Sequence, residues 1–209
     1  MAYDLSEPVR VAVIYYSATG TVYELAKTAA TAAEKAGAEV RLRKVRELAS
    51  DEVISANRMW REHVEATRHI GEATLEDLDW ADAVLMGAPT RYGGPAAQLK
   101  QFIDATGPLW GKGRLINKIV SSFTATATAH GGQEATILAL NNTFYHWGAI
   151  IVPPGYADPV QFRSGNPYGT SHTSRNGEVP PGETQLAAME FQARRVVEVA
   201  QAFKRGRAG

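Results

Sequence analysis

Short apolar runs that alternate with helical patterns constrain the fold of this chain more than any other feature. The run from Val11 to Tyr16 is nearly all apolar, which is typical of a strand covered on both faces of a parallel sheet. The segment 22–36 then carries apolar residues at helical spacing, and Gly37 follows where a C-terminal cap is expected. Because this strand-helix unit recurs along the chain, we predict a doubly wound α/β sheet.

The other elements follow from the same patterns, and five strands are predicted in all. No domain linker or internal repeat interrupts them, so residues 1–209 are predicted to form a single domain. The further strands are expected at 39–45, 83–87, 119–123 and 149–152, and the further helices from Pro95 onward, at 133–145 and at 183–204.

Two segments do not fit the repeating unit. Residues 50–70 are rich in Arg, Glu and Ala, and they predict a surface helix or a partly ordered insertion. Residues 156–182 are rich in Gly, Pro, Ser and Asn, and they are longer than an ordinary connection. A functional lid or an interface loop is therefore favoured over a plain connector in this second segment.

Charge and residue content exclude several classes of function. The 22 Lys and Arg balance the 22 Asp and Glu, so nothing favours binding to nucleic acid or an anionic membrane. The chain has no Cys, which excludes thiolate metal sites, iron–sulfur clusters and thiol redox chemistry. Any electrons must therefore be carried by a bound cofactor. No apolar run is long enough for a membrane span and no signal peptide is recognisable, so a cytoplasmic protein is expected.

The loop after the first strand has the properties of an anion-binding site. Its sequence is Ser17-Ala18-Thr19-Gly20-Thr21-Val22, and it leads into a helix whose first N–H groups have no partner in the helix. It contains no Lys or Arg and matches neither the Walker nor the Rossmann glycine pattern. A monophosphate bound without magnesium is the best fit, and simple helix capping by Ser or Thr is the alternative.

The loops after the third and fourth strands are expected beside it, since ligands of open α/β sheets bind beyond the carboxyl ends of the strands. In the segment 87–94, the glycines allow the backbone to approach a flat ring, Tyr92 can stack on it, and Arg91 or a backbone N–H can stabilise negative charge. The segment 124–134 is rich in small and hydroxyl residues, which suit contact with a cofactor edge. An ordinary Gly-Pro turn and plain β-propensity are the alternatives.

Together the loops resemble those of the WrbA-type family of NAD(P)H:quinone oxidoreductases, a branch of the flavodoxin-like superfamily. The resemblance implies a flavodoxin-like, five-stranded parallel sheet of order 2-1-3-4-5 in three α/β/α layers. The matching stretches are Tyr15-Tyr16-Ser17, Gly87 to Gly93, Gly107 to Trp110, Gly131 to Glu134, Ile151 to Tyr156 and Asn166 to Gly169.

The resemblance also implies the cofactor and the reaction. FMN is expected as the bound cofactor, NADH or NADPH as the electron donor, and a quinone as the acceptor, reduced by two electrons to the hydroquinone through flavin N5. The residues that the resemblance assigns to FMN are Ser17, Ala18, Thr19, Gly20, Thr21, Val22, Pro89, Thr90, Arg91, Tyr92, Gly93, Thr124, Ala125, Thr126, Ala127, Thr128, His130, Gly131 and His146.

Two further roles are implied by position in the family pattern. His146 matches a histidine near the flavin and is the expected catalytic residue, while Trp110 and Thr19 are expected to contact the substrates. The chain departs from these relatives at Thr19, which replaces a common aromatic residue, at Val22, which replaces a hydroxyl residue, and at Ala127, which replaces a glycine.

The remaining histidines and tryptophans considered are predicted to be structural. His63 and His69 have no metal-binding spacing and are expected at the surface, so no metal site is predicted. Trp60, Trp80 and Trp147 are expected to be packing residues.

Two other functions stay open at this point. A flavodoxin-like electron carrier is one, although carriers are commonly acidic and this chain has a net charge of zero. A flavin-dependent regulatory or binding protein is the other. The resemblance further implies a homotetramer, a dimer of dimers, with segments 50–70 and 156–182 as plausible contact elements.

Overall fold

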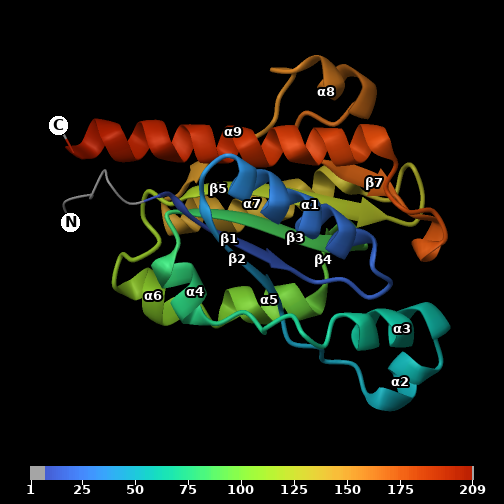
Figure 1. Ribbon diagram of the computed structural model, residues 1–209. Helices are drawn as coiled ribbons and strands as arrows, with labels where there is room; N and C mark the ends of the chain where they lie inside the picture. Colours follow the sequence, from blue (N-terminus) through green and yellow to red (C-terminus); the bar gives the residue numbers. More distant parts are fainter. Residues whose placement is uncertain (1–7, 209) are drawn as a thin grey trace.

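A computed structural model describes residues 8–208 of the chain. The elements alternate between strands and helices, as the sequence predicts, and short elements occupy the two irregular segments (Figure 1). The strands are β1 (Arg10–Tyr15), β2 (Glu39–Lys44), β3 (Ala83–Arg91), β4 (Gly94–Pro95), β5 (Ile119–Thr126), β6 (Ile150–Ile151) and β7 (Ser171–Thr173). The helices are α1 (Thr21–Lys35), α2 (Asp51–Ser55), α3 (Arg58–Ala66), α4 (Leu75–Trp80), α5 (Ala97–Asp104), α6 (Gly107–Gly111), α7 (Gln133–Trp147), α8 (Pro159–Ser164) and α9 (Glu183–Ala208), with a 3₁₀ turn η1 at Arg175–Gly177.

The central sheet is parallel and has the order β2-β1-β3-β5-β6. Since β5 and β6 are the fourth and fifth strands of the sequence prediction, the predicted order 2-1-3-4-5 is confirmed. The strands β1, β3 and β5 are buried along most of their length, because helices cover both faces of the sheet. This explains why their sequences are apolar runs rather than alternating patterns.

Two apolar clusters flank the sheet and define three layers. One cluster joins the sheet to α1 and α9, through residues such as Leu25 and Val196. The other joins it to α4, α5 and α7, through residues such as Leu99 and Phe144. Figure 1 shows α9 along one side of the sheet and α4, α5 and α6 along the other. Among the described residues 8–208, no helix has the length and apolar character needed to cross a membrane.

Several predicted boundaries were wrong. Pro95 does not open a helix: it lies in β4 and pairs with Thr90 across a tight turn, so α5 begins only at Ala97. The fifth predicted strand shrinks to Ile150–Ile151. The last helix continues past Lys204 to Ala208, because no proline or capping geometry stops it.

The long segment 156–182 is not an unstructured loop, since it contains the strand β7, which pairs with the part of β5 that β6 leaves unpaired. β6 pairs only with Ile119 and Val120, at the beginning of β5. The second half of β5 would expose its hydrogen-bonding groups, and β7 covers them by pairing with Thr124 to Thr126. This parallel pairing brings the residues after β7 to the carboxyl edge of the sheet.

The segment 50–70 folds as two short capped helices. Ser50 accepts a hydrogen bond from the Val53 N–H at the start of α2, and Asn57 accepts one from the Trp60 N–H at the start of α3. Lys44 at the end of β2 donates to the Thr67 carbonyl at 2.7 Å and ties α3 to the sheet. In Figure 1 these helices lie at the same end of the sheet as β7, with α6 at the opposite end.

Candidate flavin site at the carboxyl edge of the sheet

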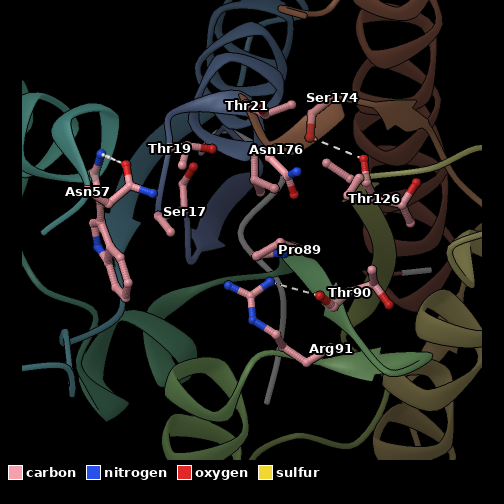
Figure 2. A pocket seen from close by; sticks show the side chains of 15 residues that line it. Ser17, Thr19, Thr21, Asn57, Pro89, Thr90, Arg91, Thr126, Ser174 and Asn176 are labelled. Atoms are coloured by element: carbon pink, nitrogen blue, oxygen red, sulfur yellow. Dashed lines mark hydrogen bonds between the residues drawn. The ribbon is translucent and has the colours of Figure 1, made fainter. Parts of the chain in front are cut away.

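A cavity of about 340 Å³ opens at the carboxyl edge of the sheet, which is within the range of small-molecule sites (Figure 2). It brings together the three loops singled out in the sequence, and it adds residues from α3 and from the turn after β7. The lining residues are Ser17, Ala18, Thr19, Thr21, Val22, Asn57, Trp60, Pro89, Thr90, Arg91, Ala125, Thr126, Ala127, Ser174 and Asn176.

The loop before α1 presents unpaired donors to this cavity. The N-cap of α1 is Gly20, with a φ of 95°, and no side chain caps the helix. The capping interpretation of the hydroxyl residues therefore does not hold, since Ser17 only accepts a hydrogen bond from the Gly20 N–H, at 3.1 Å. In the part of the chain that the structure describes, the hydroxyls of Thr19 and Thr21 have no hydrogen-bond partner. Donors at the positive end of the helix dipole are thus free for an anion.

Val22, at which the family pattern inferred from the sequence expects a hydroxyl residue, has its side chain in the apolar core between α1 and the sheet. It is almost completely buried, so only its backbone can contribute to an anion site. Because Val22 lies in the first turn of α1, its N–H has no partner within the helix. The loss of a hydroxyl here therefore leaves the backbone donor in place.

The loop after β3 is held in a fixed shape around Thr90. The Thr90 hydroxyl accepts hydrogen bonds from the Gly93 N–H at 3.1 Å and from the Thr136 hydroxyl at 2.8 Å. Arg91 donates to the Thr90 carbonyl at 2.8 Å and lies beside the cavity (Figure 2). Gly132 allows close approach, because a Cβ there would lie 3.0 Å from the Gly93 Cα. Tyr92, in contrast, is fully exposed at the tip of the turn and does not line the cavity.

The loop after β5 contributes only part of its predicted residues to the cavity. Thr126 lies at the cavity and is oriented by Gln133, whose side-chain amide donates to its hydroxyl at 3.0 Å. Thr124 is buried and donates to the Ala88 carbonyl at 2.7 Å, which makes it a structural residue of the sheet. Thr128 and His130 are exposed and do not line the cavity.

Gly20 and Gly131 border this region without lining the cavity. Gly20 lines an adjacent hollow between α1 and α3. A Cβ at Gly131 would lie 2.8 Å from the Thr126 Cβ, so glycine permits the tight turn that follows β5.

Four lining residues were not predicted from the sequence as site residues. Asn57 and Trp60 come from the segment 50–70, and Ser174 and Asn176 come from the turn after β7. Trp60 packs against the apolar core as predicted, but it also forms part of the cavity wall. Asn57 can be recognised in the sequence as a helix cap three residues before Trp60, but this pattern does not predict that α3 will turn both side chains toward the cavity.

A carboxylate network holds Trp60 in place. Glu47 accepts hydrogen bonds from the Trp60 indole N–H at 3.1 Å, from the Tyr16 hydroxyl at 2.9 Å and from the Gln98 amide at 2.8 Å. Burial opposes ionisation of Glu47, but hydrogen bonds from the Ala49 N–H, Gln98 and Tyr16 hold its pKa below the ordinary value. Burial, followed by the nearby Glu47 charge, raises the pKa of Tyr16. Through Glu47, these hydrogen bonds link the residue after β1 to helices α3 and α5 beside the cavity.

His63, predicted at the surface, is partly buried beside the loop before α1. Its ring lies 5.5 Å from the ring of Tyr23 and lines the hollow that adjoins the cavity. Burial, together with the charge of Lys44, lowers the pKa of His63 to about 4. The imidazole is therefore neutral at neutral pH.

Trp110 and His146 lie together, but far from the cavity. The Trp110 indole N–H donates to the His146 carbonyl at 2.8 Å, and both side chains are exposed. They lie near the start of β5, where Gly148 accepts from the Asn117 N–H, whereas the cavity is at its end. The strand from Ile119 to Thr126 separates these two edges by roughly 23 Å at about 3.3 Å per residue. One copy of the chain does not bring these two residues to its own cavity.

Within the described residues 8–208, no cluster of His, Cys, Asp or Glu is suited to hold a metal ion. The chemistry of the cavity is instead that of neutral hydrogen-bond donors at a helix N-terminus, with one guanidinium and one indole at its walls.

The fold places the chain among flavodoxin-like proteins. A WrbA-like flavodoxin from Agrobacterium tumefaciens superposes with a TM-score of 0.67 at 23% identity, over 93% of this chain and 98% of that chain. A flavodoxin from the domain Archaea superposes with a TM-score of 0.61 at 15% identity, over 92% of this chain and 99% of that chain. At these levels of identity the likeness shows the fold alone.

Sequence comparison identifies the family. The family model described as NADPH-dependent FMN reductase matches residues 9–160. The NAD(P)H dehydrogenase (quinone) of Deinococcus radiodurans is 47% identical over 196 residues, which cover 93% of this chain and 97% of the relative. The protein of the same description from Sinorhizobium fredii is 44% identical over 197 residues, which cover 91% of this chain and 96% of the relative. The chain therefore belongs to the NAD(P)H dehydrogenase (quinone) family, and the resemblance inferred from its loops is confirmed.

Proposed function

We propose that this chain is an FMN-dependent NAD(P)H:quinone oxidoreductase, which reduces quinones to hydroquinones by two electrons. The observation that carries the proposal is the cavity at the carboxyl edge, in which three loops converge on the uncapped N-terminus of α1. Relatives described as NAD(P)H dehydrogenase (quinone), 47% and 44% identical over almost the whole chain, support the reaction.

The cavity fits FMN at both ends. The free hydroxyls of Thr19 and Thr21, together with the N–H groups of the first turn of α1, would hold the phosphate. The segments 89–91 and 125–127 would border the ring, and they present small side chains and backbone to it. FMN, when bound, supplies the two-electron hydride chemistry that no side chain of this chain can perform.

The protein's own groups would orient the reactants and handle charge. The Arg91 guanidinium lies where it can stabilise negative charge at the ring edge. Trp60, held by Glu47, would shield the cavity from water on the α3 side. We keep Tyr92, Gly93, Thr124, Thr128, His130 and Gly131 as proposed FMN residues through their position in these loops, although their side chains do not line the cavity.

His146 and Trp110 can serve a flavin site only if they reach the cavity of another subunit. Both are exposed at the opposite edge of the sheet, and Tyr145 beside them is also exposed. We therefore propose that the chain forms a homotetramer, a dimer of dimers, in which these residues border a neighbouring site. There, Trp110 would contact the quinone, and the His146 imidazole would deliver a proton to the quinone oxygen that gains negative charge.

Flavin content and turnover test the proposal. The purified protein should be yellow and should release FMN on denaturation, and it should oxidise NADH or NADPH rapidly when benzoquinone is added. A colourless protein that does not take up FMN would contradict the flavin assignment. Tightly bound FMN with negligible quinone turnover would instead support an electron carrier or a regulatory protein.

A further inference from the structure

The turn after β7 has an unusual backbone beside the cavity. Arg175 and Asn176 are consecutive non-glycine residues in the left-handed region, with φ values of 47° and 61°. The fold imposes this conformation through Ser174, whose N–H donates to the Thr126 carbonyl at 2.7 Å and whose hydroxyl donates to the same oxygen at 3.1 Å. The turn is therefore anchored directly to the end of β5.

The same turn packs against the loop before α1. A Cβ at Gly177 would lie 2.6 Å from the Thr19 hydroxyl and 2.9 Å from the Met59 Cε, so only glycine permits this contact. A side chain much larger than Thr19 would displace the turn. The small size of Thr19 thus allows a segment from the far end of the chain to cover the loop before α1.

Asn176 is the residue that this turn presents to the cavity. It lines the cavity, and Figure 2 shows its carboxamide between Thr19 and Thr126. It forms no hydrogen bond with any residue that the structure describes. Asn176 is exposed to the cavity and solvent, so its side-chain N–H₂ group is a donor available to a ligand in the cavity that Thr19 and Thr21 also line.

We propose that Asn176 donates its side-chain N–H to the FMN phosphate, so that the turn 174–177 completes the phosphate site. This inference rests on the proposed flavin function. Since the loop before α1 contains no Lys or Arg, all the donors that this loop offers to the phosphate are neutral, and one further donor has a large relative effect. Asn176 should therefore favour FMN over riboflavin, which has the same ring and side chain without the phosphate.

The experiment measures FMN and riboflavin binding to flavin-free protein by the quenching of flavin fluorescence. Asn176→Gly removes the donor and lets the backbone keep its left-handed conformation without strain. The matched control is Arg175→Gly, which relieves the same kind of strain at an exposed residue that does not line the cavity. We expect Asn176→Gly to weaken FMN binding about 10-fold or more, as for hydrogen bonds to charged groups, with riboflavin binding little changed. Arg175→Gly should change neither.

A second variant and a second probe separate this inference from the flavin function itself. Asn176→Asp should weaken FMN binding more than Asn176→Gly, because a carboxylate would repel the phosphate. Inorganic phosphate should raise the melting temperature of the flavin-free wild type, and it should raise that of Asn176→Gly less. Failure of the wild type to bind FMN would overturn the proposed function, while the phosphate result would still test the anion contact.

Equal FMN affinity in wild type and Asn176→Gly would overturn the inference. So would an equal loss of FMN and riboflavin binding, because it would place Asn176 beside the ring or assign it a purely structural role. Melting of each flavin-free variant shows whether it is folded, and Asn176→Gly should melt no lower than the wild type.

Discussion

Threonine side chains at the carboxyl edge differ in whether the fold already uses their hydrogen bonds. Thr124 and Thr126 donate to the carbonyls of Ala88 and Thr128, and their hydroxyls are therefore committed to the protein. Thr21 lies at the N-terminus of α1, where its hydroxyl has no partner among the described residues 8–208. A hydroxyl of this kind adds no hydrogen bond to the fold and is available to a ligand.

Thr21→Val tests this distinction. The change keeps the β-branched shape but removes the hydroxyl, so we expect FMN affinity to fall about 10-fold with little change in the free energy of unfolding. The matched control is Thr28→Val in the same helix, because Thr28 donates only to the Glu24 carbonyl. Titration of flavin-free protein with FMN measures the affinity of each variant, and urea unfolding measures its stability. Equal FMN affinity for Thr21→Val and wild type would argue against a phosphate contact at this hydroxyl.

His63 predicts a specific dependence of stability on pH. Its pKa is about 4 in the folded protein and about 6.5 when unfolded, because burial and the Lys44 charge disfavour the protonated ring. The unfolded chain thus binds the proton more readily between these values, and stability falls as pH drops from about 6.5 to about 4. The loss should reach up to about 3 kcal/mol, at about 1.4 kcal/mol per pKa unit.

His63→Phe keeps a ring against Tyr23 and removes the proton, so its urea-unfolding free energy should decline less over this range than that of the wild type. His69→Phe is the control, since His69 is exposed on the same segment. An identical pH profile for His63→Phe and wild type would show that His63 is not the group responsible.

At the scale of elements, β7 decides the composition of the candidate site. It pairs with the end of β5 because β6 is too short to cover that edge. The pairing aligns Ser174 and Asn176 with the loops after β1 and β3, which are more than eighty residues away in sequence. Loss of β7 pairing would therefore remove one wall of the cavity and leave the rest of the sheet intact.

Gly169→Ala tests the position of β7. A Cβ at residue 169 would lie 2.1 Å from the Ser122 carbonyl and 3.1 Å from the Ile137 Cδ1, so the strand must shift. We expect a loss of about 1–3 kcal/mol in unfolding free energy together with weaker FMN binding. Gly107→Ala is the control, because nothing lies within 4 Å of a Cβ there. Urea unfolding and FMN titration of both variants check this. Equal unfolding free energies and equal FMN affinities for Gly169→Ala and Gly107→Ala would contradict the prediction.

At the scale of the whole molecule, the proposed catalytic residue His146 and the proposed substrate residue Trp110 lie at the opposite end of the sheet from the cavity, where Thr19 lies. Trp110 comes from the short helix α6 at that opposite end, and His146 comes from the last turn of α7, which runs back from the carboxyl edge. If both residues act on the flavin, each active site must combine two subunits. The active unit would then be an oligomer rather than a single chain.

Mixed oligomers test this arrangement. A chain carrying Trp110→Ala and His146→Ala should keep its FMN cavity but have little quinone reductase activity. A chain carrying Thr21→Glu should lose FMN, because a carboxylate would face the phosphate. Neither should be active alone, but co-expression should restore activity, since an intact cavity of one chain can meet Trp110 and His146 of the other. Activity no higher than the sum of the separate variants would contradict shared sites.

The apolar runs and the hydroxyl-rich loop before α1 could be interpreted from sequence because each is a local pattern. Burial on both faces makes β1, β3 and β5 continuous apolar runs, and their alternation with helices predicts a doubly wound parallel sheet. The strand order came from the resemblance of the loops to the WrbA-type family. Pro95 could not be placed in a strand this way, because it is a strand residue only through its pairing with Thr90. Nor could β7 be predicted, because it forms only by pairing with the open edge of β5. Short strands have too few residues for a periodic signal.

The sequence by itself therefore determined the parallel sheet, and the motifs of its loops indicated the family and hence the strand order. It also predicted an anion site in the loop before α1. Only the tertiary structure decided which side chains share the cavity: it added Trp60 and Asn176, and it placed Trp110 and His146 at the far edge. The physical reason is that strand and helix formation follow from neighbouring residues, whereas a site at the carboxyl edge is assembled by sheet pairing. Residues that are distant in the chain meet there only after the strands are aligned.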